Sequence, residues 1–226
     1  MLDKLAQGVI VGDAAVVEQY TKAAIEANLS PRRIIADGLI AGMDVVGQRF
    51  RTNEMFLPEV LRSARAMHKA LALVKPLIAS GEVISTGKVV IGTVKGDLHD
   101  IGKNLVAMML EGAGFEVVNL GVNVDTEQFV AAAQKEKADI VAASALLTTA
   151  MMEMRKLVKA VAAAGLQPRV RVILGGAPVT REFAEEVGAD GYGVDCAQAV
   201  ALARSLVAAG RKTGEQGQQP VDLCVQ

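Results

Sequence analysis

The chain has 226 residues, enough to bury a sizeable core in one large domain or two small ones. Its 24 Lys and Arg nearly balance 25 Asp and Glu, leaving a formal net charge of -1 that argues against a broad surface for nucleic acid or anionic lipid. Two cysteines, the lack of a secretory signal pattern and the absence of a long uncharged apolar run together predict a cytoplasmic protein with no membrane partner.

Helical patterns fill the first part of the sequence. Asp13 and Ser30 are suited to cap helices, and Pro31 fits a first helical position. The stretch LPEVLRSARAMHKALALVKPLI repeats apolar residues three and four apart, as an amphipathic helix does. Residues 1–85 therefore predict a helical cap bundle of four short helices.

Strands and helices alternate after the polar connector SGEVISTG, which we expect to allow movement between two domains. Five short runs, KVVIGTV, FEVVNLG, DIVAAS, RVRVILGG and GYGV, read as strands, and helical patterns begin near Ile101, Asp125, Thr149, Thr180 and Asp195. This rhythm predicts an α/β domain over residues 86–210, with a flavodoxin-like (Rossmann-like), five-stranded parallel sheet. Residues 211–226 are polar and Gly/Gln-rich, and we expect a mobile tail there.

The loop GDLHDIGKN (96–104) follows the first predicted strand, where α/β sheets commonly bind ligands. His99 in this loop has three interpretations: a polar residue bonded to a neighbouring aspartate, part of an anion cradle with Lys103, or an axial metal ligand whose imidazole is held by Asp97. The glycine spacings of nucleotide-binding loops are absent. His68 is the one other histidine, so the protein's own side chains do not complete a convincing zinc site. A single histidine ligand suggests a metal that arrives inside a macrocycle.

Three other polar residues have simpler interpretations. We expect Lys103 and Asn104 to be helix-start residues, with a contact to an amide of a bound ligand as the alternative for them. His68 lies beside the apolar stripe of its helix, which favours a packing or surface role.

Three motifs carry a resemblance to a known family. GTVKGDLHDIGKN closely resembles the D-x-H-x-x-G signature of cobalamin-binding domains, SALLTT (144–149) resembles their S-x-L segment, and LGGAPV (174–179) resembles their glycine pair. GMDVVGQRFRTNEMFLPEVLRSARAM is similar to the cap bundle of methionine synthase and of the small corrinoid proteins that serve methanol and methylamine methyltransferases. The resemblance covers nearly the whole chain.

The resemblance implies a site for cobalamin or a related corrinoid. His99 would displace the cofactor's own benzimidazole and bind cobalt from below, the base-off/His-on state, with Asp97 as its carboxylate partner. In methionine synthase a serine six residues after the S-x-L serine extends this relay; here Ala150 stands at that position, and Thr148, Thr149 or water remain open as substitutes. The other implied contacts are Val94, Gly96, Ile101 and Gly102 around the lower face, Ser144, Leu146, Thr148, Gly175, Gly176, Tyr192, Gly193, Asp195 and Ala197 around the nucleotide tail, and Phe50 and Leu57 above the methyl group.

The implied function is that of a methyl carrier that is not active alone. Its expected partners are a substrate-specific methyltransferase, an acceptor methyltransferase that uses a thiol or a pterin, and a reductive activation protein. Two alternatives stay open. A cobalamin-dependent sensor usually adds a DNA-binding unit, and the cobalamin-binding subunit of a radical mutase generally lacks such a helical cap.

Overall fold

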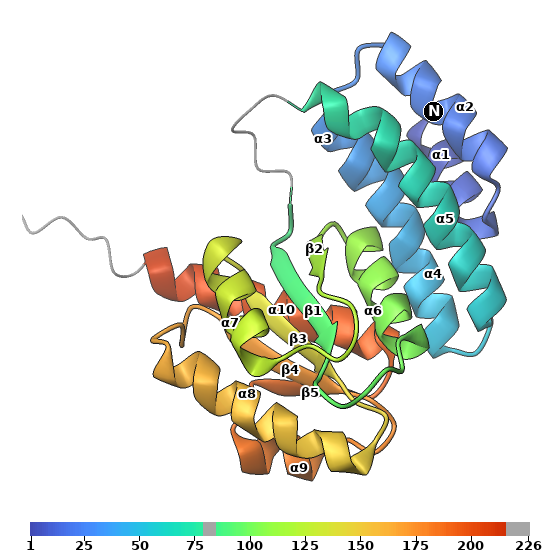
Figure 1. The fold of residues 1–226 in the computed structure, drawn as a ribbon. Helices are drawn as coiled ribbons and strands as arrows, with labels where there is room; N and C mark the ends of the chain where they lie inside the picture. Colours follow the sequence, from blue (N-terminus) through green and yellow to red (C-terminus); the bar gives the residue numbers. More distant parts are fainter. Residues whose placement is uncertain (79–84, 216–226) are drawn as a thin grey trace, which may run out of the picture.

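The structure is a computed structural model that describes residues 1–78 and 85–215, with the side chains of 211–215 left aside. Its N-terminal part is helical and lies to one side of an α/β part (Figure 1). The helices are α1 (Leu2–Val11), α2 (Ala14–Glu26), a continuous run of α3 (Pro31–Arg33), η1 (Ile34–Ile40) and α4 (Ala41–Arg51), then α5 (Leu57–Val74) and η2 (Lys75–Leu77). The segment η1 is π-helical.

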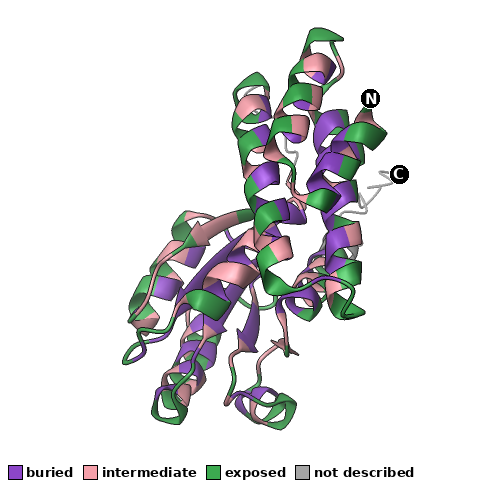
Figure 2. Cartoon of the chain, turned by 90° about the vertical axis from the view of Figure 1, so that its right-hand side faces the viewer, coloured by how far each residue is buried: buried purple, intermediate pink, exposed green. Residues whose placement is uncertain are grey.

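Local sequence signals explain where these helices begin and how they pack. The side chain of Asp13 accepts hydrogen bonds from the amides of Ala15 and Val16, as an N-cap does. Leu5, Leu39 and other apolar side chains that recur at helical spacing are fully buried in a shared core. Figure 2 shows these buried stripes turned inward, with the outer faces exposed.

A five-stranded parallel sheet follows, as predicted. Its strands are β1 (Lys88–Thr93), β2 (Glu116–Asn119), β3 (Ile140–Ser144), β4 (Arg171–Gly175) and β5 (Gly191–Gly193), in the order β2-β1-β3-β4-β5. The helices between and after them are α6 (Ile101–Gly112), α7 (Thr126–Lys135), η3 (Thr148–Ala150), α8 (Met151–Ala163), α9 (Arg181–Val187) and α10 (Cys196–Glu215). The predicted fold class is confirmed.

Alternate strand residues cover the two faces of the sheet. Val89 and Ile91 pack with α6 and α10, whereas Val90 packs with α7, α8 and α9. Because side chains alternate along a strand, this division places helices on both faces of the sheet. The bundle joins the α6 and α10 side, where Met109 and Cys196 belong to its core.

Two expected segments fall at the edges of what the structure describes. Of the connector SGEVISTG, residues 80–84 lie outside the described residues. Residues 211–215 of the expected tail belong to α10, which ends at Glu215. Residues 216–226 lie outside the described part. Within the described ranges, no helix is long and apolar enough to cross a membrane.

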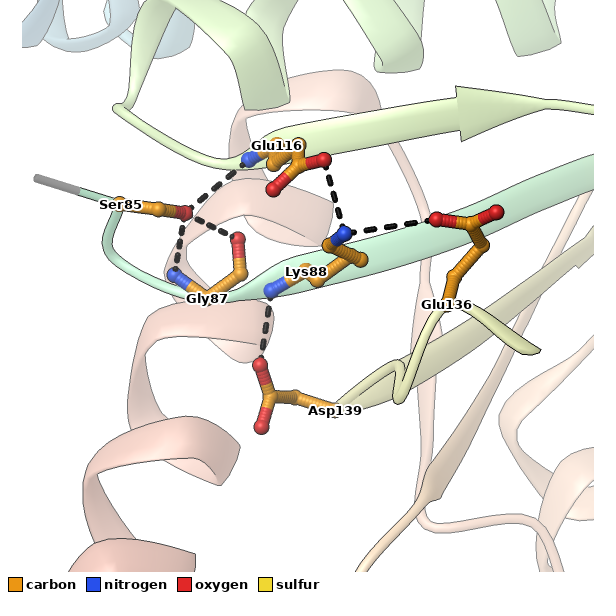
Figure 3. A network of polar contacts seen from close by, with 6 residues as sticks. All are labelled: Ser85, Gly87, Lys88, Glu116, Glu136 and Asp139. Carbon is orange, nitrogen blue, oxygen red and sulfur yellow. Dashed lines mark hydrogen bonds and ion pairs between the residues drawn. The ribbon is translucent and has the colours of Figure 1, made fainter. Parts of the chain in front are cut away.

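The start of β1 is fixed by a polar network (Figure 3). The Lys88 ammonium lies 2.8 Å from Glu116 and 3.4 Å from Glu136, and the Lys88 amide donates to Asp139 Oδ2 at 2.7 Å. The Ser85 hydroxyl donates to the Gly87 carbonyl and accepts from the Gly87 and Glu116 amides. The last residues of the connector SGEVISTG are therefore hydrogen-bonded to the α/β part.

Candidate functional site

The loop between β1 and α6 lies where the strand order reverses. The chain passes from β1 outward to β2, then returns to the other side of β1 for β3. At such a point the connections from neighbouring strands diverge and leave a crevice at the carboxyl ends of the strands. Gly96, with a φ of 82°, turns the backbone in this loop, and its amide donates to Asn123 Oδ1 at 2.8 Å.

Asp97 holds His99 in one orientation. Asp97 Oδ1 accepts from the His99 amide at 2.9 Å and lies 2.7 Å from His99 Nδ1. Since an ionised carboxylate only accepts, Nδ1 carries a hydrogen, and in the neutral imidazole Nε2 is then the nitrogen with the free lone pair. The imidazole side chain is 54% exposed, and no hydrogen bond from another described residue reaches Nε2. His99 Nε2 is therefore left without a hydrogen bond from the described residues, on a half-exposed ring that Asp97 holds.

The carboxylate beneath His99 is fully buried and stays ionised. Burial works to raise the pKa of Asp97, but hydrogen bonds from the amides of His99, Leu146 and Leu147 and from the His99 ring outweigh it and hold the pKa at about 2. The second oxygen, Oδ2, accepts from the Leu146 amide at 2.5 Å and from the Leu147 amide at 3.0 Å. Asp97 therefore joins the β1 loop to the loop after β3.

A cavity of about 700 Å³ opens beside His99. Its walls come from the loop after β1, the first turns of α6, the ends of β3, β4 and β5, the start of α10, and α4 of the bundle. The volume lies within the range of sites that hold cofactors. The residues singled out in the sequence that line it are Phe50, His99, Ile101, Gly102, Ser144, Leu146, Gly175, Gly176, Tyr192, Gly193 and Asp195.

The remaining residues of the predicted site lie outside this cavity. Val94 and Asp97 are buried residues of the segment after β1, and Gly96 is an exposed residue of the same segment. The others are Thr148, exposed in η3, Ala197, which lines a separate cavity of about 620 Å³ with Arg204, and Leu57, partly exposed at the start of α5.

The surface around His99 fits a large, flat, mostly apolar group. Leu98 is 72% exposed and Ile101 is 79% exposed, the two highest values among the exposed large apolar side chains of the described residues. A β-carbon built on Gly102 would meet no described atom within 4 Å, so the backbone there is open to close approach. No group of three or more His, Cys, Asp or Glu in the described ranges could hold a metal alone. A metal at His99 needs its other ligands from a cofactor, as the equatorial nitrogens of a corrin would supply.

Reasoning from the sequence missed two features of this site. The Leu146 and Leu147 amides, which satisfy Asp97, are backbone groups that no motif marks. Lys103 is 3% exposed and bonds two asparagines, although its position suggested an ordinary helix-start residue. A lysine in an otherwise apolar helix pattern was the available signal.

This chain is similar to known proteins over both its helical part and its α/β part. Residues 87–201 match the family of B12 binding domains, and residues 1–75 match a second family that is also described as a B12 binding domain. A corrinoid protein of Desulfitobacterium hafniense is 41% identical over 92% of this chain and 97% of its own length. The dimethylamine corrinoid protein of Methanosarcina barkeri is 39% identical over 92% of this chain and 98% of its own.

Two solved structures have the same fold. The methanol:cobalamin methyltransferase complex of Methanosarcina barkeri matches with a TM-score of 0.83 and 31% identity, over 97% of this chain and 85% of that chain. A cobalamin-binding protein of Desulfitobacterium hafniense matches with a TM-score of 0.76 and 31% identity, over 91% and 98% of the two chains.

Proposed function

We propose that this chain, which belongs to the B12-binding family of corrinoid proteins, carries a methyl group on a corrinoid whose cobalt is bound from below by His99. The observation that supports it is the Asp97–His99 pair, in which Nδ1 lies 2.7 Å from Asp97 Oδ1 and the half-exposed ring lines the cavity. A corrinoid in this place supplies a cobalt centre that accepts a methyl group from one molecule and gives it to another.

The residues of the loop after β1 would then orient His99 and support the lower face of the corrinoid. Asp97 fixes the tautomer of His99, because its ionised carboxylate accepts from the ring at Nδ1. Leu98, Ile101 and Gly102 form the surface on which the lower face would rest. Val94 and Gly96 shape the loop beneath this surface.

The deep part of the cavity would take the displaced nucleotide tail. Ser144, Gly175 and Gly176 lie at the ends of β3 and β4, where small residues leave room for a ligand between the strand ends. Tyr192, Gly193 and Asp195 extend the same wall from β5. Leu146 lines the opening, and we place Thr148 and Ala197 at its margins.

The bundle would shield the upper face. Phe50 reaches the cavity from α4 and is the residue of the helical part that lines it. Leu57, at the start of α5, lies farther from it and would cover the site only if the bundle moved closer. A methyl carrier needs a removable cover, because its methyltransferase partners must reach the metal.

The carrier proposal implies three protein partners. A substrate-specific methyltransferase would load the methyl group, and an acceptor methyltransferase would pass it to a thiol or a pterin. A reductive activation protein would restore the cofactor after accidental oxidation. The complex of methanol:cobalamin methyltransferase supports the first of these, since the relative in it shares this fold at 31% identity.

Reconstitution tests the proposal directly. The chain is loaded with cobalamin, reduced, and mixed with methanol or a methylamine and a candidate methyltransferase, while absorbance follows the cofactor. We expect one methyl group per chain and no further turnover until an acceptor methyltransferase and a thiol are added. Repeated transfer between free small molecules by this chain alone, or failure to retain cobalamin, would contradict the proposal.

A further inference from the structure

Lys103 is a buried cation with no carboxylate partner at ion-pair distance. It lies in the first turn of α6, is 3% exposed, and is the one Lys or Arg among the buried polar residues that the structure describes. No carboxylate in the described ranges lies within 4.0 Å of its ammonium. Burying a charge costs free energy unless strong hydrogen bonds compensate. A lysine at such a position needs a structural reason that an apolar residue would not meet.

Two asparagines supply the compensating hydrogen bonds. Lys103 Nζ donates to Asn104 Oδ1 at 2.6 Å and to Asn119 Oδ1 at 2.8 Å. Asn119 Nδ2 also donates to Asn104 Oδ1 at 3.1 Å, and Asn104 Nδ2 donates to Asp100 Oδ2 at 2.9 Å. The four side chains connect the residue after His99, the start of α6 and the end of β2. We call this set, Asp100, Lys103, Asn104 and Asn119, the α6 clamp.

A second contact fixes the other end of the same loop. The side-chain oxygen of Asn123, after β2, accepts from the Gly96 amide at 2.8 Å, and the backbone amide of Asn123 donates to the Asp97 carbonyl at 3.0 Å. Thr93 Oγ1 donates to the His99 carbonyl at 2.9 Å. The loop from 94 to 100 is thus held on the β2 side at both ends, while Asp97 holds it on the β3 side.

We propose that Lys103 is a positioning residue for His99: its ammonium, through Asn104 and Asn119, ties the start of α6 to the end of β2 and keeps the His99 loop in the one geometry that presents Nε2. This inference rests on the proposed function, because it concerns how the imidazole is offered to cobalt. A metal ligand must be held to within about 0.5 Å of its productive place, and neighbouring hydrogen bonds provide that accuracy.

The clamp predicts a local effect when its cation is removed. Lys103→Met keeps the side chain's length and apolar stem but removes the charge, and Asn119→Ala removes one acceptor while leaving Lys103 in place. Both variants should speed amide hydrogen exchange at residues 96–100 of the cofactor-free chain by about tenfold or more relative to β4 and α8. Asn119→Asp keeps an acceptor for Lys103 and should retain slow exchange.

Lys88→Met is the matched control. Lys88 is the first residue of β1, the strand that leads into the His99 loop. Like Lys103 it contacts β2, and it is a partly buried lysine with two carboxylate partners, Glu116 and Glu136 (Figure 3). Its loss should lower the melting temperature without changing exchange at residues 96–100. A purely structural role for Lys103 would make the two lysine variants alike.

Cobalamin binding gives the second readout. Lys103→Met and Asn119→Ala should weaken cobalamin binding by about tenfold and lower the fraction of Co(II) protein with nitrogen coupling from histidine, while Lys88→Met should leave both unchanged. Exchange that is unaltered in the two variants, or that rises equally throughout the chain, overturns the positioning role of Lys103. A wild-type chain that does not retain cobalamin overturns the proposed function instead.

Discussion

The two ends of β1 satisfy their polar groups in different ways. At its start, the Lys88 ammonium lies between Glu116 and Glu136, so charge meets opposite charge (Figure 3). Past its end, the buried Asp97 carboxylate orients His99, whose second ring nitrogen has no partner among the described residues. At the start of β1 the charged groups pair with one another and stabilise the fold. After its end, one ring nitrogen of His99 stays without a partner among the described residues and is available to a ligand.

Apolar exposure follows the same division. Leu98 and Ile101 lie largely exposed beside His99, whereas Val89 and Val90, next to Lys88, are fully buried. Exposed apolar side chains cost hydration free energy unless something covers them. The region after the end of β1 therefore exposes apolar surface that a large bound cofactor would cover.

The largest effect is expected from the glycine beside the cavity. A β-carbon at Gly176 would lie within 1.9 Å of the Ala145 carbonyl oxygen, at a φ of 125°. Gly176→Ala should therefore lower the free energy of unfolding by about 3 kcal/mol or more, measured by urea denaturation. Gly188 also has a positive φ, of 79°, but no described atom within 4 Å of its β-carbon position. Gly188→Ala should cost about 1 kcal/mol, and equal losses in the two variants would refute the close approach at Gly176.

Carboxylates at the two ends of β1 sharpen the comparison. Asp97→Asn should weaken cobalamin binding by about 10- to 100-fold, because the amide no longer holds the imidazole by a charge-assisted bond. Asp139→Asn is the control, since Asp139 accepts from the Lys88 amide at the opposite end of β1. It should change stability without changing affinity, both followed by thermal melts and cobalamin titration. Comparable losses of affinity in the two variants would remove the distinction between the ends.

Acid should remove the contribution of Asp97 to stability. Its pKa is about 2 in the folded chain against an ordinary 3.8, so the ionised group stabilises the fold by about 2 kcal/mol. Because the folded pKa is the lower one, this contribution is complete above 3.8 and disappears as the pH falls through about 2. Unfolding of the cofactor-free chain should show a gap between wild type and Asp97→Asn that closes over this range. A gap that stays constant would contradict the low pKa.

The smallest effect separates stability from binding at one residue. Gly102 lies inside α6 with open space where a β-carbon would point. Gly102→Ala should raise the free energy of unfolding of the cofactor-free chain by about 0.5–1 kcal/mol, since alanine favours a helix over glycine. The same methyl group would obstruct a corrin and weaken cobalamin binding. Stronger folding with unchanged binding would place the corrin away from Gly102.

The fold was predictable because its signals are local. Short apolar runs between helical patterns predicted all five strands, Asp13 was recognisable as a cap, and the helix expected to begin near Asp125 begins at Thr126. The bundle contacts with α6 and α10 were not predictable, since Met109 and Cys196 carry no mark of a neighbour far away in sequence.

The site was predictable only as far as its motifs reach. His99 and Asp97 stood out by residue type, and their contact at 2.7 Å follows from their spacing in a tight loop. The α6 clamp was missed, because Asn104 and Asn119 meet only when β2 lies beside the start of α6. The backbone amides that bind Asp97 have no side chain to recognise.

The central claim, that His99 binds the cobalt of a corrinoid, has one direct measurement. The chain is produced with histidine labelled with ¹⁵N in the ring, loaded with unlabelled cobalamin and reduced to Co(II), and its EPR spectrum is recorded. Coordination by His99 Nε2 predicts that each triplet splitting becomes a doublet on labelling, and that the doublet disappears in His99→Ala. Triplets that persist in the labelled protein would show that the cofactor's own base remains bound to cobalt and would contradict the account.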